Sequence, residues 1–216
     1  MAKATAIFTM ATKIDIANQA LSLLGDPTTI TSIDPPDGST QAGNVSRLYP
    51  IALRRLEEEN EWTFLTKATR PALLGNDFAD LHGFNNGFHL PADCVRLIGV
   101  YEKATDQHEV PYKVVVNSDT DSLMILTDEE SPIVRYVAHI DKPTLYPQYF
   151  VECLVTLLCI YLVGPIKESN YTNQTLASLE KMYANALTRA KTADAQTGRY
   201  SKTQLRIPSH LKARGV

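Results

Sequence analysis

The stretch from Pro147 to Val163 constrains this chain most, because it is apolar on nearly every side of a helix rather than along one stripe. A helix that is apolar all round has to be enclosed by other elements. Proline suits the first position of a helix, and the Gly164-Pro165 pair is a strong stop signal, so the sequence predicts a buried helix that ends at Val163. Burying each large apolar side chain contributes roughly 1.5 to 3 kcal/mol before entropic costs, so this helix can form the centre of a domain.

A transmembrane span is the alternative interpretation of this stretch. At ~1.5 Å rise per residue its length is roughly 25 Å, which is short of the ~30 Å hydrocarbon core, and Gln148 and Glu152 lie inside it. We therefore expect a core helix and no membrane partner.

The cysteines, Cys94, Cys153 and Cys159, are odd in number, which indicates a reducing compartment. The first residues have no sustained apolar run, so we expect a protein made in the cytoplasm.

Three further segments have helical periodicity. Residues 13–24, 39–60 and 173–192 each carry apolar side chains at three- and four-residue steps, and the charged residues 57–59 are predicted on the solvent side of the second helix. The only tryptophan follows that helix, and its bulk suits a plug that closes the helical layer. The predicted structural core is drawn from this segment and the apolar helix: Trp62, Phe64, Phe150, Leu154 and Leu158.

Between residues 69 and 140 the pattern changes to alternation and β-branched residues, which predicts strands. The candidate strands span 88–90, 94–101, 111–116, 122–126 and 133–139, in one small, mainly antiparallel sheet. The predicted fold class is α+β. An antiparallel helical bundle (11–65 plus 145–194) carries an inserted small antiparallel β domain (66–144) and an extended basic C-terminal tail (195–216).

The charge of the chain is unevenly distributed. Residues 187–216 contain seven basic residues and one acid, whereas the rest contains 14 basic and 23 acidic residues. The tail also carries hydrophobic side chains at Tyr200, Leu205, Ile207 and Leu211. An acidic body with a basic tail indicates a tail that docks on another molecule.

The sequence shows no clear catalytic site, metal site or cofactor site. The five histidines are isolated, and neither a glycine-rich phosphate loop nor a nucleophile elbow occurs. The residues Glu57, Glu58, Glu59 and Glu61 leave one enzymatic alternative open, a cell-wall or polysaccharide hydrolase with an acid and base pair. A charge run of this kind is more often a solvated helix face, so we expect no enzyme. A second alternative is a nucleic-acid-binding module that uses the basic tail.

Several short motifs, in this order and spacing, resemble one family. They are Asp15-Ile-Ala-Asn18-Gln-Ala20-Leu21, Glu61-Trp62-Thr-Phe64, Leu90-Pro91-Ala92-Asp93 and Tyr146-Pro147-Gln-Tyr-Phe150. The chain resembles the head-to-tail adaptor proteins of short-tailed bacteriophages, also called tail tubular protein A or gatekeeper proteins. The resemblance covers about residues 13 to 195 and implies a helical bundle with an inserted β domain.

What the resemblance implies about function is structural. Such adaptors form a dodecameric ring that binds the portal protein above and a tail nozzle or hub protein below, in the neck of the virion. Viral double-stranded DNA passes through the lumen without sequence-specific binding. The tail is then the candidate portal-binding segment, with these residues: Arg199, Tyr200, Lys202, Leu205, Arg206, Ile207, Leu211, Lys212 and Arg214.

Overall fold

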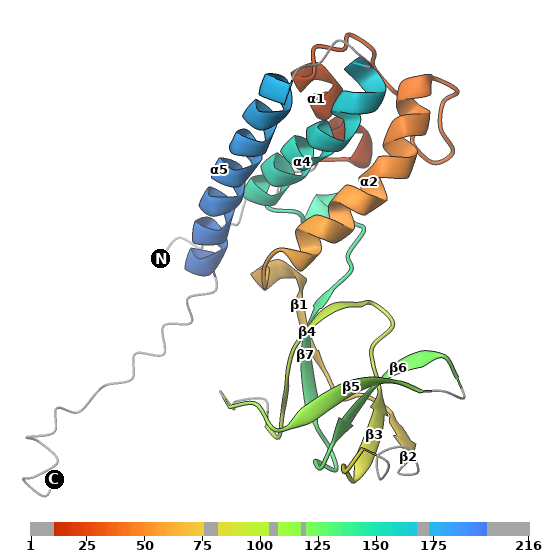
Figure 1. Ribbon diagram of the computed structural model, residues 1–216, viewed down its shortest axis with the longest axis vertical. Coiled ribbons are helices and arrows are strands. Elements are labelled where there is room, and N and C mark those ends of the chain that lie inside the picture. Colours follow the sequence, from red (N-terminus) through yellow and green to blue (C-terminus); the bar gives the residue numbers. More distant parts are fainter. Residues whose placement is uncertain (1–10, 76–81, 104–107, 118–119, 168–172, 198–216) are drawn as a thin grey trace, which may run out of the picture.

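The protein is a mixed α+β chain whose strands lie at one end of a group of helices (Figure 1). The computed structural model describes residues 11–75, 82–103, 108–117, 120–167 and 173–197. The helices are α1 (Lys13–Leu23), α2 (Thr40–Glu58), α4 (Gln148–Lys167) and α5 (Asn173–Thr197), with short 3-10 helices η1 (Thr63–Leu65) and η2 (Pro143–Leu145). The strands are β1 (Thr66–Thr69), β2 (Leu73–Gly75), β3 (Asn86–His89), β4 (Cys94–Tyr101), β5 (Tyr112–Asn117), β6 (Ser122–Thr127) and β7 (Ile133–Ala138). The predicted α+β class and antiparallel pairing are confirmed.

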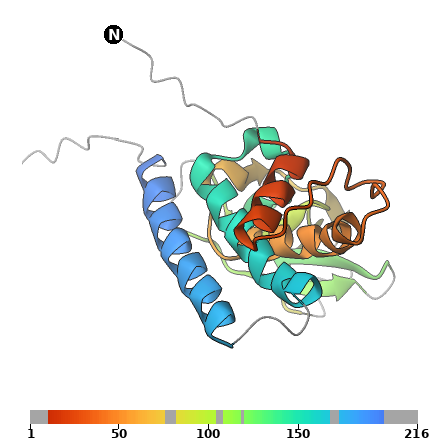
Figure 2. The ribbon, with the colours of Figure 1, turned by 90° about the horizontal axis from the view of Figure 1, so that it is seen from above.

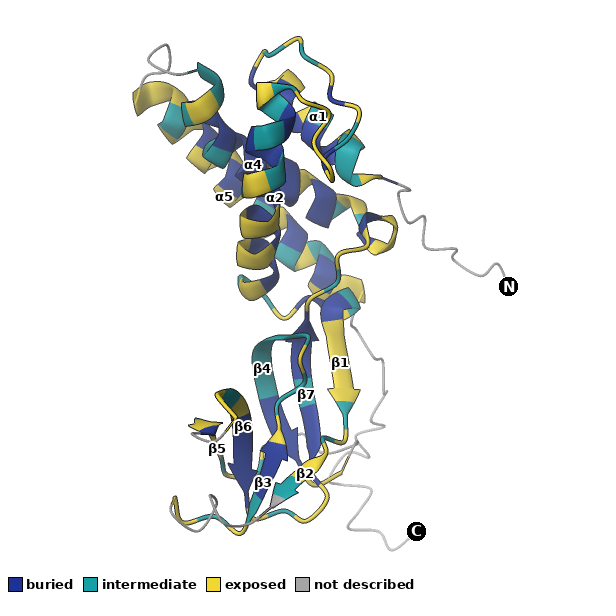
Figure 3. Ribbon diagram, turned by 90° about the vertical axis from the view of Figure 1, so that its right-hand side faces the viewer, coloured by how far each residue is buried: buried dark blue, intermediate teal, exposed yellow. Residues whose placement is uncertain are grey.

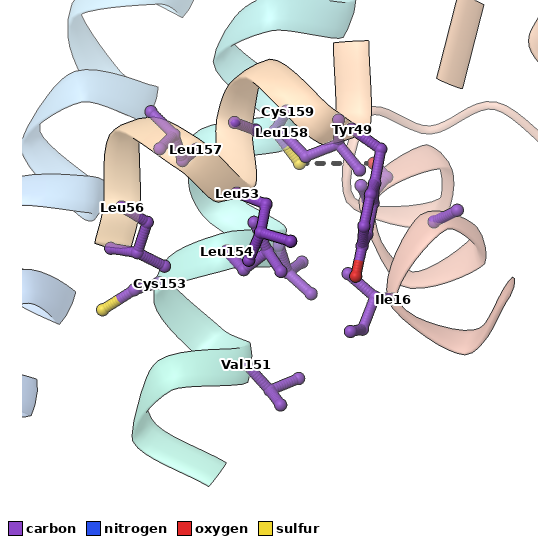
Figure 4. Packing of buried hydrophobic residues seen from close by; sticks show 14 of the residues in the cluster. Ile16, Tyr49, Leu53, Leu56, Val151, Cys153, Leu154, Leu157, Leu158 and Cys159 are labelled. Carbon is purple, nitrogen blue, oxygen red and sulfur yellow. Dashed lines mark hydrogen bonds between the residues drawn. The ribbon is translucent and has the colours of Figure 1, made fainter. Parts of the chain in front are cut away.

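Helix α4 is buried on nearly all sides, as its sequence predicts. It packs against α1, α2 and α5, which surround it (Figures 1 and 2). Figure 4 shows Leu53 and Leu56 of α2 facing α4, and the thiol of Cys159 donating to the carbonyl of Ala20 on α1 at 3.3 Å. By length and composition α4 could also cross a membrane, but most of its apolar stretch is buried inside this structure. We refer to α1, α2, α4 and α5 together as the helical part.

The predicted end of the apolar helix at Val163 is wrong, because α4 continues through Gly164 and Pro165 to Lys167. Gly164 keeps a negative φ, so it does not form the left-handed cap that a glycine stop signal predicts. A proline removes one intrahelical N–H and crowds the carbonyl four residues earlier. Here that disruption falls in the last turn, where it affects little of the helix.

The first two helices begin at the signals that their sequences carry. Thr12 and Asp15 form a capping box at α1, in which each side chain accepts from the other residue's backbone N–H. Ser39 caps α2 by accepting from the N–H of Ala42. The loop between them is fixed by Asn18, whose side chain accepts from and donates to the backbone of Ile30 at 2.9 and 3.1 Å.

The strands form two antiparallel sheets rather than the single sheet predicted (Figure 3). One sheet has the order β1-β7-β4 and the other β2-β3-β6-β5. The sequence pattern missed β1 and β2, and both are edge strands. The side chains of β1 are mostly exposed on both faces, and β2 is only three residues long, so neither has the alternation of a half-buried strand. We refer to the seven strands that the structure describes as the strand part.

Two further expectations are corrected. Glu57 is fully buried rather than on the solvent side of α2. Helix α5 continues to Thr197, past residue 192, where the helix was predicted to end, and past residue 194, where the helical bundle was predicted to end. Asp194, the last residue of the predicted helical bundle, is a buried residue inside α5. The proposed tail is thereby shortened at its beginning, and residues 198–216 lie outside the described residues.

Candidate functional site at the junction of helices and strands

Two chain segments connect the helical part to the strand part. Residues 59–65 lead from α2 through η1 to β1, and residues 139–147 lead from β7 through η2 to α4 (Figure 1). If these two segments contacted only water, they could act as a hinge between the helical part and the strand part. The structure instead places one buried carboxylate, carried by a neighbouring helix, against each segment.

Asp194 of α5 holds the first connection. Its carboxylate accepts from the backbone N–H of Thr63 at 3.0 and 3.2 Å and from the Thr63 hydroxyl at 3.1 Å. It also accepts from the hydroxyl of Tyr149 at 2.8 Å, and only 2% of the residue is exposed. Thr63 begins η1, so Asp194 satisfies an N–H that the short helix leaves without an intrahelical partner. Burial raises the pKa of Tyr149, and its bond to Asp194 raises it further.

Glu57 of α2 holds the second connection. One carboxylate oxygen lies 2.9 Å from Nδ1 of His139, and the other accepts from the backbone N–H of Ile140 at 3.1 Å. The carbonyl of Ile140 in turn accepts from the hydroxyl of Tyr146 at 2.5 Å. Burial raises the pKa of Glu57, and the bonds from His139 and Ile140 offset this only in part.

An aromatic cluster fills the space between the two connections. Trp62 lies edge-on to Phe150 at 5.3 Å between ring centroids and stacks on Tyr149 at 6.3 Å, while Phe64 contacts Tyr146 at 6.2 Å. The indole N–H of Trp62 donates to the carbonyl of Leu56 at 2.7 Å. Pairs of this geometry add roughly 0.5 to 1.5 kcal/mol each beyond area burial. The aromatic cluster therefore holds the two connections at a fixed distance from each other, in addition to the contacts that Asp194 and Glu57 make with them.

On the strand side, Asp93 joins three elements. Its carboxylate accepts from the ammonium of Lys67 on β1 at 2.6 Å and from the hydroxyl of Tyr136 on β7 at 3.0 Å. Its backbone carbonyl accepts from the N–H of His139 at 2.7 Å. Burial alone would raise the pKa of Asp93, but the two side-chain bonds outweigh it and lower the pKa. Burial and the bond to Asp93 raise the pKa of Tyr136 to about 12.

The four glutamates of the hydrolase alternative have separate partners. Glu57 is buried against His139, whereas Glu58 pairs with Arg54, Glu59 with Arg55 and Glu61 with Arg96. Each carboxylate thus holds a local contact, and the geometry assigns all four to the junction or to the outer face of α2.

The other residues singled out from the sequence divide into two groups. Trp62, Phe150, Leu154 and Leu158 are fully buried, and Phe64 is half-buried against the same core. The portal-binding candidates from Arg199 to Arg214 all lie outside the described residues.

Sequence reasoning missed Glu57 and Asp194, although a signal for both exists. Glu57 follows the buried Leu53 by four residues on α2, and Asp194 follows the buried Ala190 by four residues on α5. Both acids thus continue an apolar stripe. An acid at such a position is buried only where the fold brings a hydrogen-bond partner to it. The partners here, His139 and Thr63, are far away in the sequence, so the pattern alone does not reveal them.

Two surface features flank the helical part. A groove of about 320 Å³ lies between α1, α4 and α5, with the exposed apolar side chains Leu23 and Met182 at its edge. The outer face of α2 carries an exposed isoleucine, Ile51, beside Arg54 and Arg55. Because α1, α2 and α5 surround α4, the groove between α1 and α5 lies across α4 from α2 (Figure 2).

Comparison of the chain with protein-family models gives no match, and comparison with curated protein sequences gives none.

Proposed function

We propose that the protein is a head-to-tail adaptor of a short-tailed bacteriophage, a structural protein that forms a ring between the portal and the tail nozzle. The observation that carries this proposal is the junction, where each connection between the helical part and the strand part is held by a buried carboxylate. Such an arrangement fixes the angle between the helical part and the strand part, which are the two unlike ends of the molecule. An adaptor needs this property because it binds different partners above and below and must keep them in register.

The residues that carry the family resemblance support the proposal by their positions. Asn18 fixes the loop after α1, Trp62 fills the aromatic cluster, and Asp93 joins β1 to β7. These side chains determine where the elements lie, so a protein that keeps them keeps the relative placement of helices and strands. On this proposal the helical part is the bundle of the adaptor fold and the strand part is its inserted domain.

The ring contact follows from the two flanking surfaces. A closed ring of identical subunits uses heterologous contacts, in which each copy presents two different faces. We assign the groove between α1 and α5 to one face and the α2 surface around Ile51 to the other. The groove is lined by Glu152 and Arg189, and the α2 surface carries Arg54, Arg55 and Glu58, so each face offers groups of both charges to the other. Ile51 of one copy then inserts beside Met182 of the next.

The lumen and the portal contact complete the proposal. Residues 1–186 contain 23 acids against 14 basic residues, so most of the chain does not attract DNA phosphate, which suits a conduit. The proposed portal-binding segment lies beyond Thr197 and carries both basic residues and four large apolar side chains. Ordering such a segment costs roughly 1 to 2 kcal/mol per residue, which apolar contacts and ion pairs with an acidic portal surface must offset.

The ring contact can be tested by a break and a rescue. Ile51→Asp places a carboxylate against Met182 of the neighbour, so we expect rings assembled on the portal to disappear in negative-stain electron microscopy. Adding Met182→Lys supplies an opposite charge and is expected to restore rings. Leu73→Asp is the matched control, since Leu73 is equally exposed but lies on β2, away from both faces. Rings that persist with Ile51→Asp, or a failure of Met182→Lys to rescue, would remove this contact from the proposal.

A further inference from the structure

Strand β5 is an edge strand whose outer side the fold leaves open. It pairs with β6 on one side and is the last strand of its sheet (Figure 3). Its pairing with β6 runs residue to residue along the whole strand, Tyr112–Asn117, without a bulge. A regular edge strand presents a row of unpaired N–H and C=O groups, to which another strand can bind.

The ladder shows which backbone groups of β5 face outward. The carbonyl of Leu123 on β6 accepts from the N–H of Leu90, so the backbone groups of Leu123 point toward β3 and away from β5. Leu123 lies opposite Val116, whose backbone groups therefore point away from β6. The same holds for Val114, two residues earlier on β5. No residue that the structure describes binds these outward groups of Val114 and Val116.

The side chains at this edge form an exposed apolar patch. Val114 and Val116 are 39% and 59% exposed, and Leu123, opposite Val116, is 49% exposed. We call these three residues the β5 patch. They lie on the sheet face that packs against the first sheet through Ile125, beyond the area that the first sheet covers. The single charged residue of β5, Lys113, lies on the opposite face, so no charge of β5 protects the patch.

The other three sheet edges are less suited to pairing. Strand β1 has four residues and carries the charged Lys67, and β2 has three residues in irregular register with β3. Strand β4 has two irregularities in its pairing with β7, and the carbonyl of its Val100 already accepts from Val110. Among the described residues, the regular open strand that a second copy offers to β5 is thus β5 itself.

We propose that β5 pairs antiparallel with β5 of a second copy, about a two-fold axis at Val115. In this register Val114 of each copy lies opposite Val116 of the other, and the two residues exchange both of their outward hydrogen bonds. Lys113 lies opposite Asn117 of the other copy, so like charges do not meet. The two β5 patches join into one apolar surface across the combined sheet.

This contact is separate from the proposed ring contact. It is isologous, because both copies use the same surface, whereas a closed ring joins two different faces of each copy. The proposal therefore concerns the protein free in solution and does not rest on the proposed function.

Sedimentation equilibrium of the full chain tests the dimer. Contacts of small area are weak, so the concentration series extends to about 1 mM. Val114→Lys/Val116→Lys places like charges opposite each other, and we expect it to weaken dimerisation about tenfold or more. Leu73→Lys/Leu145→Lys is the matched control, because it adds the same charge at two exposed leucines away from β5, and it is expected to leave the dimer unchanged.

Two results would overturn the proposal in this experiment. One is a natural chain that stays monomeric throughout the series, and the other is an equal effect of the two double variants. Ile51→Asp separates the dimer from the ring contact, since Ile51 lies on α2 and its replacement is expected to leave the dimer intact. A dimer that is lost with Ile51→Asp but kept with Val114→Lys/Val116→Lys would also contradict the proposal.

A single cysteine tests the register. Facing residues of a non-hydrogen-bonded pair, such as Val115 with Val115 of the second copy, have Cα atoms about 4.5 Å apart, within the roughly 4.4 to 6.8 Å of a disulfide. In a Cys94→Ser background, Val115→Cys is expected to link two chains on mild oxidation. Burial raises the pKa of the native Cys153 and Cys159 thiols to about 12, so these compete little.

Lys113→Cys is the control for this cross-link. The position is more exposed than Val115, yet in the proposed register it faces Asn117, so we expect about tenfold less disulfide-linked dimer on a non-reducing gel. Equal linking of the two variants, or no link with Val115→Cys, would overturn the two-fold pairing at Val115.

Discussion

Asp194, three residues before the end of α5, accepts a hydrogen bond from the backbone N–H of Thr63, which lies 131 residues earlier in the chain. The contact joins the last described helix to the segment that leads from α2 into β1. Glu57 makes the corresponding contact to Ile140 on the segment that returns from β7. The two carboxylates hold both connections, so the helical part and the strand part are expected to behave as one body.

The Asp194 contact can be measured through stability. Asp194→Ala removes the acceptor for the Thr63 N–H, the Thr63 hydroxyl and the Tyr149 hydroxyl, and we expect it to lower the free energy of unfolding by about 2 to 4 kcal/mol. Asp194→Asn keeps one oxygen and is expected to cost about half as much. Urea unfolding measures both, with the exposed Thr192→Ala as control. An Asp194→Ala variant as stable as that control would show that the contact contributes nothing.

Glu57 offers a sharper comparison because one substitution keeps its shape. Glu57→Ala leaves the Ile140 N–H without its acceptor and is expected to cost about 3 kcal/mol. Glu57→Gln keeps an oxygen for Ile140 and is expected to cost less than about 1 kcal/mol. Glu58→Gln, on the exposed pair with Arg54, is expected to change stability by less than about 0.5 kcal/mol. The assignment fails if Glu57→Ala and Glu58→Gln have the same effect in thermal unfolding.

The raised pKa of Glu57 gives a pH dependence of known sign. Because the folded chain holds this proton more tightly than the unfolded chain, the stabilisation is complete below the ordinary pKa of 4.5 and is lost as pH rises through the raised pKa. The unfolding free energy of the natural chain, relative to Glu57→Gln, is thus expected to fall from acid to neutral pH. A difference that rises with pH would mean that the bonds from His139 and Ile140 outweigh burial.

Trp62 is a built-in probe of the junction, because it is the only tryptophan and is fully buried. It contacts Tyr149 and Phe150 of α4 and donates to the carbonyl of Leu56 on α2. We expect blue-shifted fluorescence that red-shifts in the same urea transition as the loss of helical circular dichroism. A fluorescence change that precedes the loss of helix would show that the junction opens before the helical part unfolds.

The sequence predicted the elements of the helical part well because their signals are local. Ser39 caps α2 through the next turn of its own helix, and the enclosed α4 follows from its composition alone. The predicted stop at Gly164 failed because a glycine and a proline weaken a helix without determining where it ends.

The junction could not be predicted, because its contacts join distant residues. Neither the position of Glu57 on an apolar stripe nor that of Asp194 identifies the partner that satisfies it. The division into two sheets was missed for the same reason, since β1 pairs only with β7 and has no alternation of its own.

The central claim is tested most directly by co-sedimentation of the purified protein with the portal ring of the same phage, comparing the full chain with a chain that stops after Thr197. We expect the full chain to bind at a fixed ratio as a ring, and the shortened chain, which keeps the whole of α5, to lose this binding. If both chains bind, the helical part rather than the basic segment makes the portal contact. If the full chain does not bind, the adaptor function itself is contradicted.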